Sequence, residues 1–173
     1  MPFGAISCNG MKGSCFPKNT RVLTNRGYVF IQDIDIIHDT INGQPIIALV
    51  SDIQPITYMV LIKSNTFKPN VPTRNVLLDS NCKVKIDTDI YSVKNCIDGS
   101  RIVMYRYKGY GYNLILEGSR GMIVNNMLTE TLNANNDISK YIISQILDIA
   151  AEKAQIKIKD DNISSKLLES TTS

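Results

Sequence analysis

The stretch that decides the fold is residues 15–34, which read CFPKNTRVLTNRGYVFIQDI. Residues 20–24 alternate and are rich in residues that favour strands, and residues 28–31 are again aromatic and β-branched. Between them, residues 25–27 (Asn-Arg-Gly) have the composition of a tight turn. The stretch therefore predicts a β-hairpin, with Cys15 at the open end of that hairpin.

The residue pattern of this stretch is Cys-Phe-Pro-x-x-Thr-x-Val-x-Thr-x-x-Gly-Tyr-x-x-Ile-x-Asp-Ile. It closely resembles the opening block of the Hint domain, the all-β self-processing module that hedgehog autoprocessing domains and inteins share. Residues 72–84 resemble the second block of that family, and residues 115–132 resemble its closing strands. The resemblance covers roughly residues 8–132, and it implies a mainly β, Hint-type fold built of hairpins.

The resemblance also implies a chemistry. In the family, the thiol of the first cysteine, here Cys15, attacks the carbonyl carbon of the preceding residue, here Ser14, and converts that amide into a thioester. The family's second block contains Thr or Ser followed three residues later by His, and the matching residues here are Asp79 and Cys82. The candidate catalytic residues are therefore Cys15, Asp79 and Cys82, and both partners of the cysteine nucleophile are altered.

These replacements predict slow self-cleavage or none. An amide nitrogen is a poor leaving group unless it is protonated, and general acid–base catalysis of this kind is worth about 10²–10⁴-fold. The Cys82 thiol is a weak proton donor, and Asp79 is expected to be ionised near neutral pH from an ordinary pKa of about 3.9. If the fold is of the Hint type, Cys82 should lie beside Cys15, and an oxidisable pair of these two thiols is a further hypothesis.

Splicing is excluded by the closing block. Inteins cyclise an asparagine that follows a histidine and precedes Cys, Ser or Thr, whereas this chain reads Val124-Asn125-Asn126-Met127 and continues well beyond. Asn126 is instead predicted to occupy a left-handed turn position, which asparagine tolerates better than other residues with a side chain.

The sequence predicts three parts: a leader over 1–14, the Hint-like β-domain over 15–132, and residues 133–173. The last part begins with a polar linker, and Asp137 is placed as a helix N-cap. Apolar residues then recur at helical spacing, which predicts one amphipathic α-helix over about 138–158, followed by a polar tail. No internal repeat is visible in the sequence.

Composition narrows the class of protein. Hydrophobic residues make up 43% of the 173, enough for one core without disulfide or metal support. The sequence has no secretion signal and no apolar run near the roughly 20 residues of a membrane span, so the expected location is the cytoplasm. Four cysteines without a Cys-x-x-Cys pair and a single histidine predict no metal and no cofactor. That histidine, His38, is predicted to lie in a surface turn, and Cys96 to act as a small core residue.

Residues 101–112 interleave basic and aromatic side chains, which predicts an exposed β-hairpin. A nucleic-acid-binding ribbon has the same composition. The net charge of +3 and the pI of about 8.6 argue against nucleic acid as the partner.

Two functions remain open. In the first, the chain is a degenerate Hint domain that acts as a structural or interaction subunit and contacts other protein subunits through the C-terminal helix or the Tyr/Arg-rich hairpin. A composition rich in Asn, Ile and Lys, together with an orphan Hint domain, suits a large DNA virus or an AT-rich microbe. A component of the virion is therefore a second expectation beside the cytoplasm. In the alternative, the chain is an active, cysteine-dependent self-cleaving domain that breaks the bond between Ser14 and Cys15.

Overall fold

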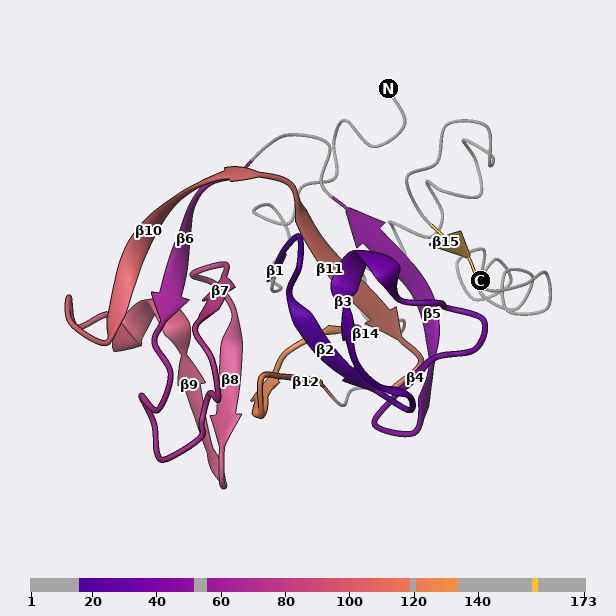
Figure 1. The fold of residues 1–173 in the computed structure, drawn as a ribbon, viewed down its shortest axis with the longest axis horizontal. Coiled ribbons are helices and arrows are strands. Elements are labelled where there is room, and N and C mark those ends of the chain that lie inside the picture. The colour runs from indigo at the N-terminus through magenta and orange to yellow at the C-terminus, as the bar shows by residue number, and fades with distance from the viewer. Residues whose placement is uncertain (1–15, 52–55, 119–120, 134–156, 159–173) are drawn as a thin grey trace, which may run out of the picture.

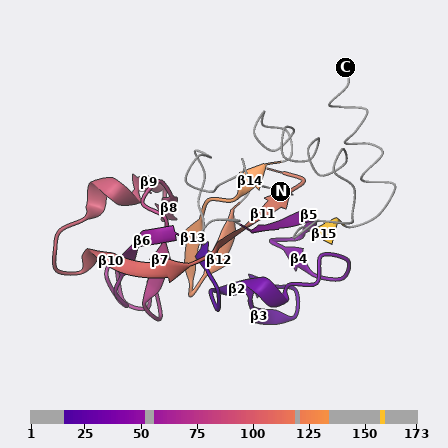
Figure 2. The same cartoon turned by 90° about the horizontal axis from the view of Figure 1, so that it is seen from above.

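A computed structural model describes residues 16–51, 56–118, 121–133 and 157–158 of the chain. These residues are mainly β, as the sequence predicts, and they form three sheets (Figures 1 and 2). Within this part of the chain no α-helix occurs, and two short 3₁₀ helices, η1 (Ile31–Asp33) and η2 (Val93–Cys96), follow β-hairpins. The strands are β1 (Phe16–Pro17), β2 (Arg21–Thr24), β3 (Gly27–Phe30), β4 (Thr40–Ile41), β5 (Gln44–Ser51), β6 (Ile56–Ile62), β7 (Val76–Leu78), β8 (Lys83–Ile86), β9 (Asp89–Ser92), β10 (Ile102–Gly109), β11 (Gly111–Leu116), β12 (Met122–Val124), β13 (Met127–Thr129), β14 (Leu132–Asn133) and β15 (Lys157–Ile158).

The hairpin predicted from residues 20–31 is confirmed. Strands β2 and β3 pair antiparallel, with Val22 opposite Val29 and Thr24 opposite Gly27. Gly27 has a φ of 98°, a conformation that glycine adopts without steric cost. Ile31 already belongs to η1. Its backbone N–H donates to the carbonyl of Thr20, 2.8 Å away, and this bond closes the open end of the hairpin.

The turn of this hairpin is fixed by a buried carboxylate. Nε of Arg26 donates to Oδ1 of Asp39 at 2.7 Å, and Nη2 donates to Oδ2 at 3.1 Å. Asp39 is almost fully buried and also accepts from the backbone N–H of Asp35. The Arg26 hydrogen bond is the main cause that lowers the pKa of Asp39, so the pair stays ionised well into the acid range.

One six-stranded sheet contains the same unit twice, a β-hairpin followed by a 3₁₀ helix, and the sequence does not reveal this repeat. Its strand order is β3-β2-β12-β13-β8-β9, so the hairpin β12–β13 lies at the centre with a second hairpin on each side. Each outer hairpin leads into a 3₁₀ helix. The hydrogen bond from Ile31 N–H to the carbonyl of Thr20 is matched by one of 3.0 Å from Val93 N–H to the carbonyl of Cys82.

The other two sheets are linked by one long, bent stretch of chain. Strand β10 pairs with β6 in a three-stranded sheet, and β11 continues from β10 but pairs with β5 in another six-stranded sheet (Figure 1). The prediction of a hairpin over 101–112 is therefore wrong, because β10 and β11 do not pair with each other. An irregularity between Arg106 and Gly109 bends the chain, and each half finds its partner in a different earlier strand.

The hydrophobic core draws on all three sheets and on both 3₁₀ helices. Fully buried members include Phe16 of β1, Ile31 of η1, Leu78 of β7, Leu114 of β11 and Met127 of β13. Because β1 lies beside β7 as well as beside β11, the start of the described chain is packed against the segment that resembles the second Hint block.

The leader over 1–14 and the polar tail lie outside the described residues, and so does most of the helix predicted over 138–158. At the end of that range, Lys157 and Ile158 form β15, which pairs with β5, so the helix does not continue to 158. No helix among the described residues is long and apolar enough to cross a membrane.

Candidate functional site

Of the three predicted catalytic residues, Cys15 lies outside the described residues. The next residue, Phe16, is fully buried and pairs with Tyr112 of β11. The adjoining turn is held by Thr20, whose hydroxyl donates to the carbonyl of Pro17 at 2.7 Å. The chain that follows Cys15 is thus fixed by the core on one side and by a closed turn on the other.

Asp79 and Cys82 lie together in the turn that joins β7 to β8. The backbone N–H of Cys82 donates to the carbonyl of Asp79 at 3.0 Å, and Oδ1 of Asp79 accepts from the backbone N–H of Asn81 at 2.7 Å. The thiol of Cys82 is fully buried, and it donates to the backbone carbonyl of Lys83 at 3.4 Å. Both side chains are therefore buried at the two ends of a turn in which Asn81 is exposed, and the Asp79 carboxylate closes that turn.

Burial raises the pKa of Asp79 above its ordinary value of 3.8, and the hydrogen bonds from Asn81 offset part of that effect. The folded chain therefore binds the Asp79 proton more tightly than the unfolded chain does. The contribution of Asp79 to the free energy of unfolding is fully present below pH 3.8, and it is lost as the pH rises through the raised pKa.

We expect Asp79→Asn to be more stable than the wild type at pH 7, because an amide keeps the acceptor for Asn81 without a buried charge. The difference in the free energy of unfolding should shrink to nothing as the pH falls below 3.8. Urea denaturation between pH 3 and pH 8 measures it. Asp98→Asn is the matched control, because backbone N–H groups, led by that of Ile102, lower the pKa of Asp98, and the substitution should destabilise at pH 7. A wild type more stable than Asp79→Asn at pH 7 would contradict the expectation.

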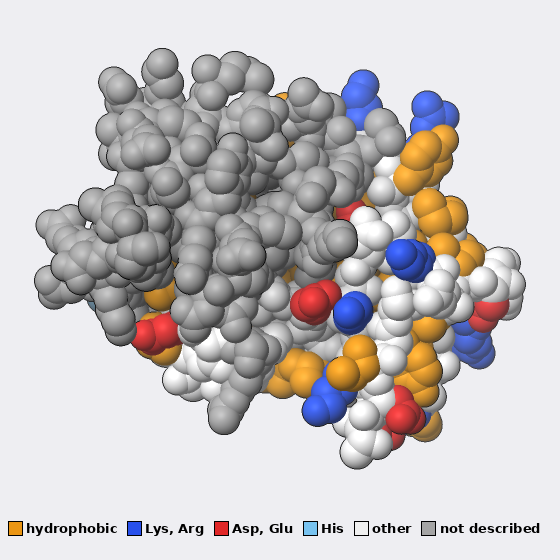
Figure 3. Space-filling view, turned by 180° about the vertical axis from the view of Figure 1, so that it is seen from behind, with side chains coloured by type: hydrophobic (Ala, Val, Ile, Leu, Met, Phe, Trp, Pro, Cys, Tyr) orange, Lys and Arg blue, Asp and Glu red, His pale blue; other side chains and the backbone are white. Residues whose placement is uncertain are grey.

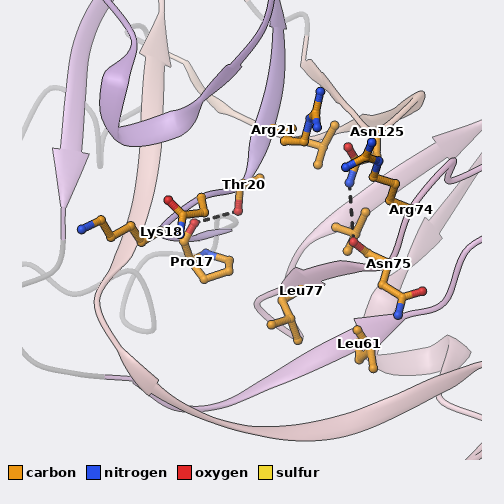
Figure 4. A pocket seen from close by; sticks show the side chains of 12 residues that line it. Pro17, Lys18, Thr20, Arg21, Leu61, Arg74, Asn75, Leu77 and Asn125 are labelled. Carbon is orange, nitrogen blue, oxygen red and sulfur yellow. Dashed lines mark hydrogen bonds between the residues drawn. The ribbon is translucent and has the colours of Figure 1, made fainter.

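A pocket of about 260 Å³ lies where three distant segments meet: residues 17–21, 74–77 and 124–125, with Leu61 at its edge (Figure 4). These are parts of the three segments that resemble the Hint blocks. Asp79 and Cys82 are not among the residues that line it. The fold thus brings the three blocks together and keeps the two predicted catalytic partners out of the pocket that they form.

The pocket is basic, which the sequence did not predict. Lys18, Arg21 and Arg74 line it, and none of its described lining residues is an acid, a histidine or a cysteine. The described residues provide no ion-pair partner for these three cations. Arg21 also lies over the ring of Tyr28, with Cζ 5.8 Å from the ring centroid. Lys18 and Arg21 belong to one segment, and Arg74 lies 53 positions after Arg21, so only the tertiary fold reveals that all three line one pocket.

The closing block forms one wall of this pocket. Asn125 and Asn126 both have positive φ, 46° and 67°, which confirms the left-handed turn predicted for Asn126. The carbonyl of Asn125 accepts from the backbone N–H of Thr73 at 2.9 Å, and its Nδ2 lies 3.5 Å from the carbonyl of Asn75. These contacts tie the β12–β13 turn to the second block.

Two further residues that the sequence singles out, His38 and Cys96, lie in a surface turn and against the core. His38 lies in an exposed turn, with Nδ1 2.8 Å from Oδ2 of Asp35. Cys96 is half-buried and packs against the hydrophobic core, and burial raises its pKa. Within the described ranges, no group of three or more His, Cys, Asp or Glu residues is placed to hold a metal ion.

In comparisons with known proteins, no family model matches the chain, and no curated protein matches it. The fold and the pocket define its class as a mainly β domain with a basic pocket at the junction of three segments.

Proposed function

We propose that this chain is a Hint-like domain that has lost self-cleavage and acts as a structural or interaction subunit that binds other proteins. The observation that carries the proposal is the position of Asp79 and Cys82. Both are buried in the turn between β7 and β8, and neither lines the pocket formed by the three Hint-like segments. Self-cleavage at Cys15 needs a proton donor for the leaving nitrogen, and its loss costs about 10²–10⁴-fold in rate.

The outer face of the six-stranded sheet supports an interaction role. Ile123, Leu128, Lys85 and Ile90 lie opposite one another across β12, β13, β8 and β9, so they form one row on the same face. A groove of about 690 Å³ follows this row. Ile90 is 67% exposed, and with the partly exposed Ile123 and Leu128 it leaves apolar surface along the groove, as surfaces that bind partners do.

The strands of the predicted Tyr/Arg-rich contact surface add a second exposed area. Tyr58 of β6 and Met104 and Tyr105 of β10 are about half exposed, and Tyr58 lies opposite Arg106. Seen from behind, the described surface of the molecule shows hydrophobic side chains mixed with basic ones (Figure 3). Aromatic and basic side chains of this kind are enriched where proteins meet.

Thiol alkylation of the native protein tests the proposal. We expect iodoacetamide at pH 8 to modify the half-buried Cys96 at least about tenfold faster than the fully buried Cys82, because a buried thiol reacts only when its surroundings open. Peptide mapping by mass spectrometry measures both rates, and a sample unfolded in urea provides the control in which both react. A Cys82 that reacts in the native state as fast as Cys96 would place an accessible thiol where the family has its histidine, and would contradict the proposal.

A further inference from the structure

We propose that the basic pocket formed by residues 17–21, 74–77 and 124–125 binds a phosphate group carried by a small molecule. This inference goes beyond the proposed binding of other proteins, and it rests on the proposed loss of self-cleavage, which leaves the pocket to another ligand.

The charge of the pocket identifies the class of ligand. Lys18, Arg21 and Arg74 line the pocket from two segments, and no carboxylate lines it among the described residues. The two arginines lie on the same side, whereas the ammonium of Lys18 extends away from them on the other (Figure 4). An oxyanion beside the two arginines would supply the counter-charge that the described lining residues lack. Arginine presents a planar fork of donors that matches phosphate oxygens, which a lysine ammonium complements as a point charge.

Figure 4 shows where these groups lie. Arg21, Arg74 and Asn125 gather on one side of the pocket, and Lys18 and Thr20 lie on the other. The Nδ2 group of Asn125, a residue only 8% exposed, is 3.5 Å from the carbonyl of Asn75, at the outer limit of a hydrogen bond. The Asn125 amide N–H is held only weakly, so it is suited to donate to a further oxygen atom beside the two arginines.

The volume of the pocket limits how much of a ligand it can enclose. Pockets that enclose whole drug-sized ligands measure about 300–1,000 Å³, and this one measures about 260 Å³. It has room for a phosphate group, while most of a larger molecule would stay outside. Binding to nucleic acid would require basic residues in a stripe along a groove. Here the three cations share one small pocket, and the whole chain carries only +3.

The test is a titration of the full chain with pyrophosphate, followed by ¹H–¹⁵N NMR, with ionic strength held constant by sodium chloride. We expect saturable shifts confined to residues 17–21, 74–77 and 124–126. Arg74→Gln should weaken binding by about tenfold or more, as expected for a lost hydrogen bond to a charged group. Arg101→Gln is the matched control, because Arg101 is also exposed and lies outside the pocket, and it should bind like the wild type.

Two results would overturn this inference. Shifts that spread over the surface without saturation, or equal weakening by Arg74→Gln and Arg101→Gln, would show that only net charge is at work. A single-stranded oligonucleotide that binds the pocket more tightly than pyrophosphate would assign the site to nucleic acid. The intact mass of the same samples separates the two proposals: a full-length chain that ignores pyrophosphate overturns only the phosphate site, and loss of residues 1–14 overturns the proposed function.

Discussion

Gly121→Ala is expected to destabilise the protein by about 3 kcal/mol or more, because it overpacks the centre of the six-stranded sheet. Gly121 directly precedes β12, and a Cβ atom there would overlap the backbone carbonyl oxygen of Thr129 in β13. The neighbouring Met122 pairs with Thr129, so the clash falls within the central hairpin. Backbone atoms cannot turn away as a side chain can. The hairpin must therefore open, and the outer hairpins lose the strands with which they pair.

Thermal unfolding measures this effect. For a chain of this size the expected drop in Tm is roughly 6–12 °C. Gly118→Ala is the matched control, because its Cβ would meet the flexible end of the Gln44 side chain, and the cost should stay below about 1 kcal/mol. Equal losses for both substitutions would mean that the close approach of Gly121 to Thr129 does not occur in the folded protein.

Phe16→Ala is expected to lower the free energy of unfolding by about 3–5 kcal/mol, as deletion of a fully buried aromatic ring usually does. Phe16 has no exposed surface, although it is the first described residue. Its ring packs in the core that all three sheets share, and its backbone pairs with Tyr112. The substitution leaves a cavity and releases the strand that follows Cys15.

Urea denaturation followed by circular dichroism checks this expectation, with the loss of stability seen as a lower midpoint at an unchanged slope. Phe30→Ala is the control, because Phe30 is 43% exposed on β3 and should cost less than about 1 kcal/mol. If Phe16→Ala were as mild as Phe30→Ala, β1 would not be part of the core.

The sequence correctly predicted two turns, because their conformation depends on the residues within them. The hairpin β2–β3 follows from strand-forming residues on either side of a turn that ends in Gly27, and the turn at Asn126 follows from the tolerance of asparagine for positive φ. The same reasoning failed for residues 101–112. Alternation shows that a stretch is extended, but it does not say which strand lies beside it, and here the partners are β6 and β5.

The repeated unit and the basic pocket depend on tertiary structure. Thr20 and Cys82 occupy matching positions in the two outer hairpins, but a threonine and a cysteine show no repeat when their sequences are compared. Lys18 and Arg74 are 56 positions apart in the printed sequence, and only the packing of β1 beside β7 brings their segments to one pocket. Sequence therefore singled out the three segments that meet at the pocket, but not the groups that line the space between them.

The intact mass of the purified full chain tests the loss of self-cleavage most directly. The protein is incubated with and without dithiothreitol or hydroxylamine, which attack thioesters, beside a Cys15→Ala variant that cannot form one. We predict a single full-length mass in every sample, because the side chains of Asp79 and Cys82 are buried and do not line the pocket. A thiol-dependent break between Ser14 and Cys15 that is missing from Cys15→Ala would contradict this and establish an active self-cleaving domain.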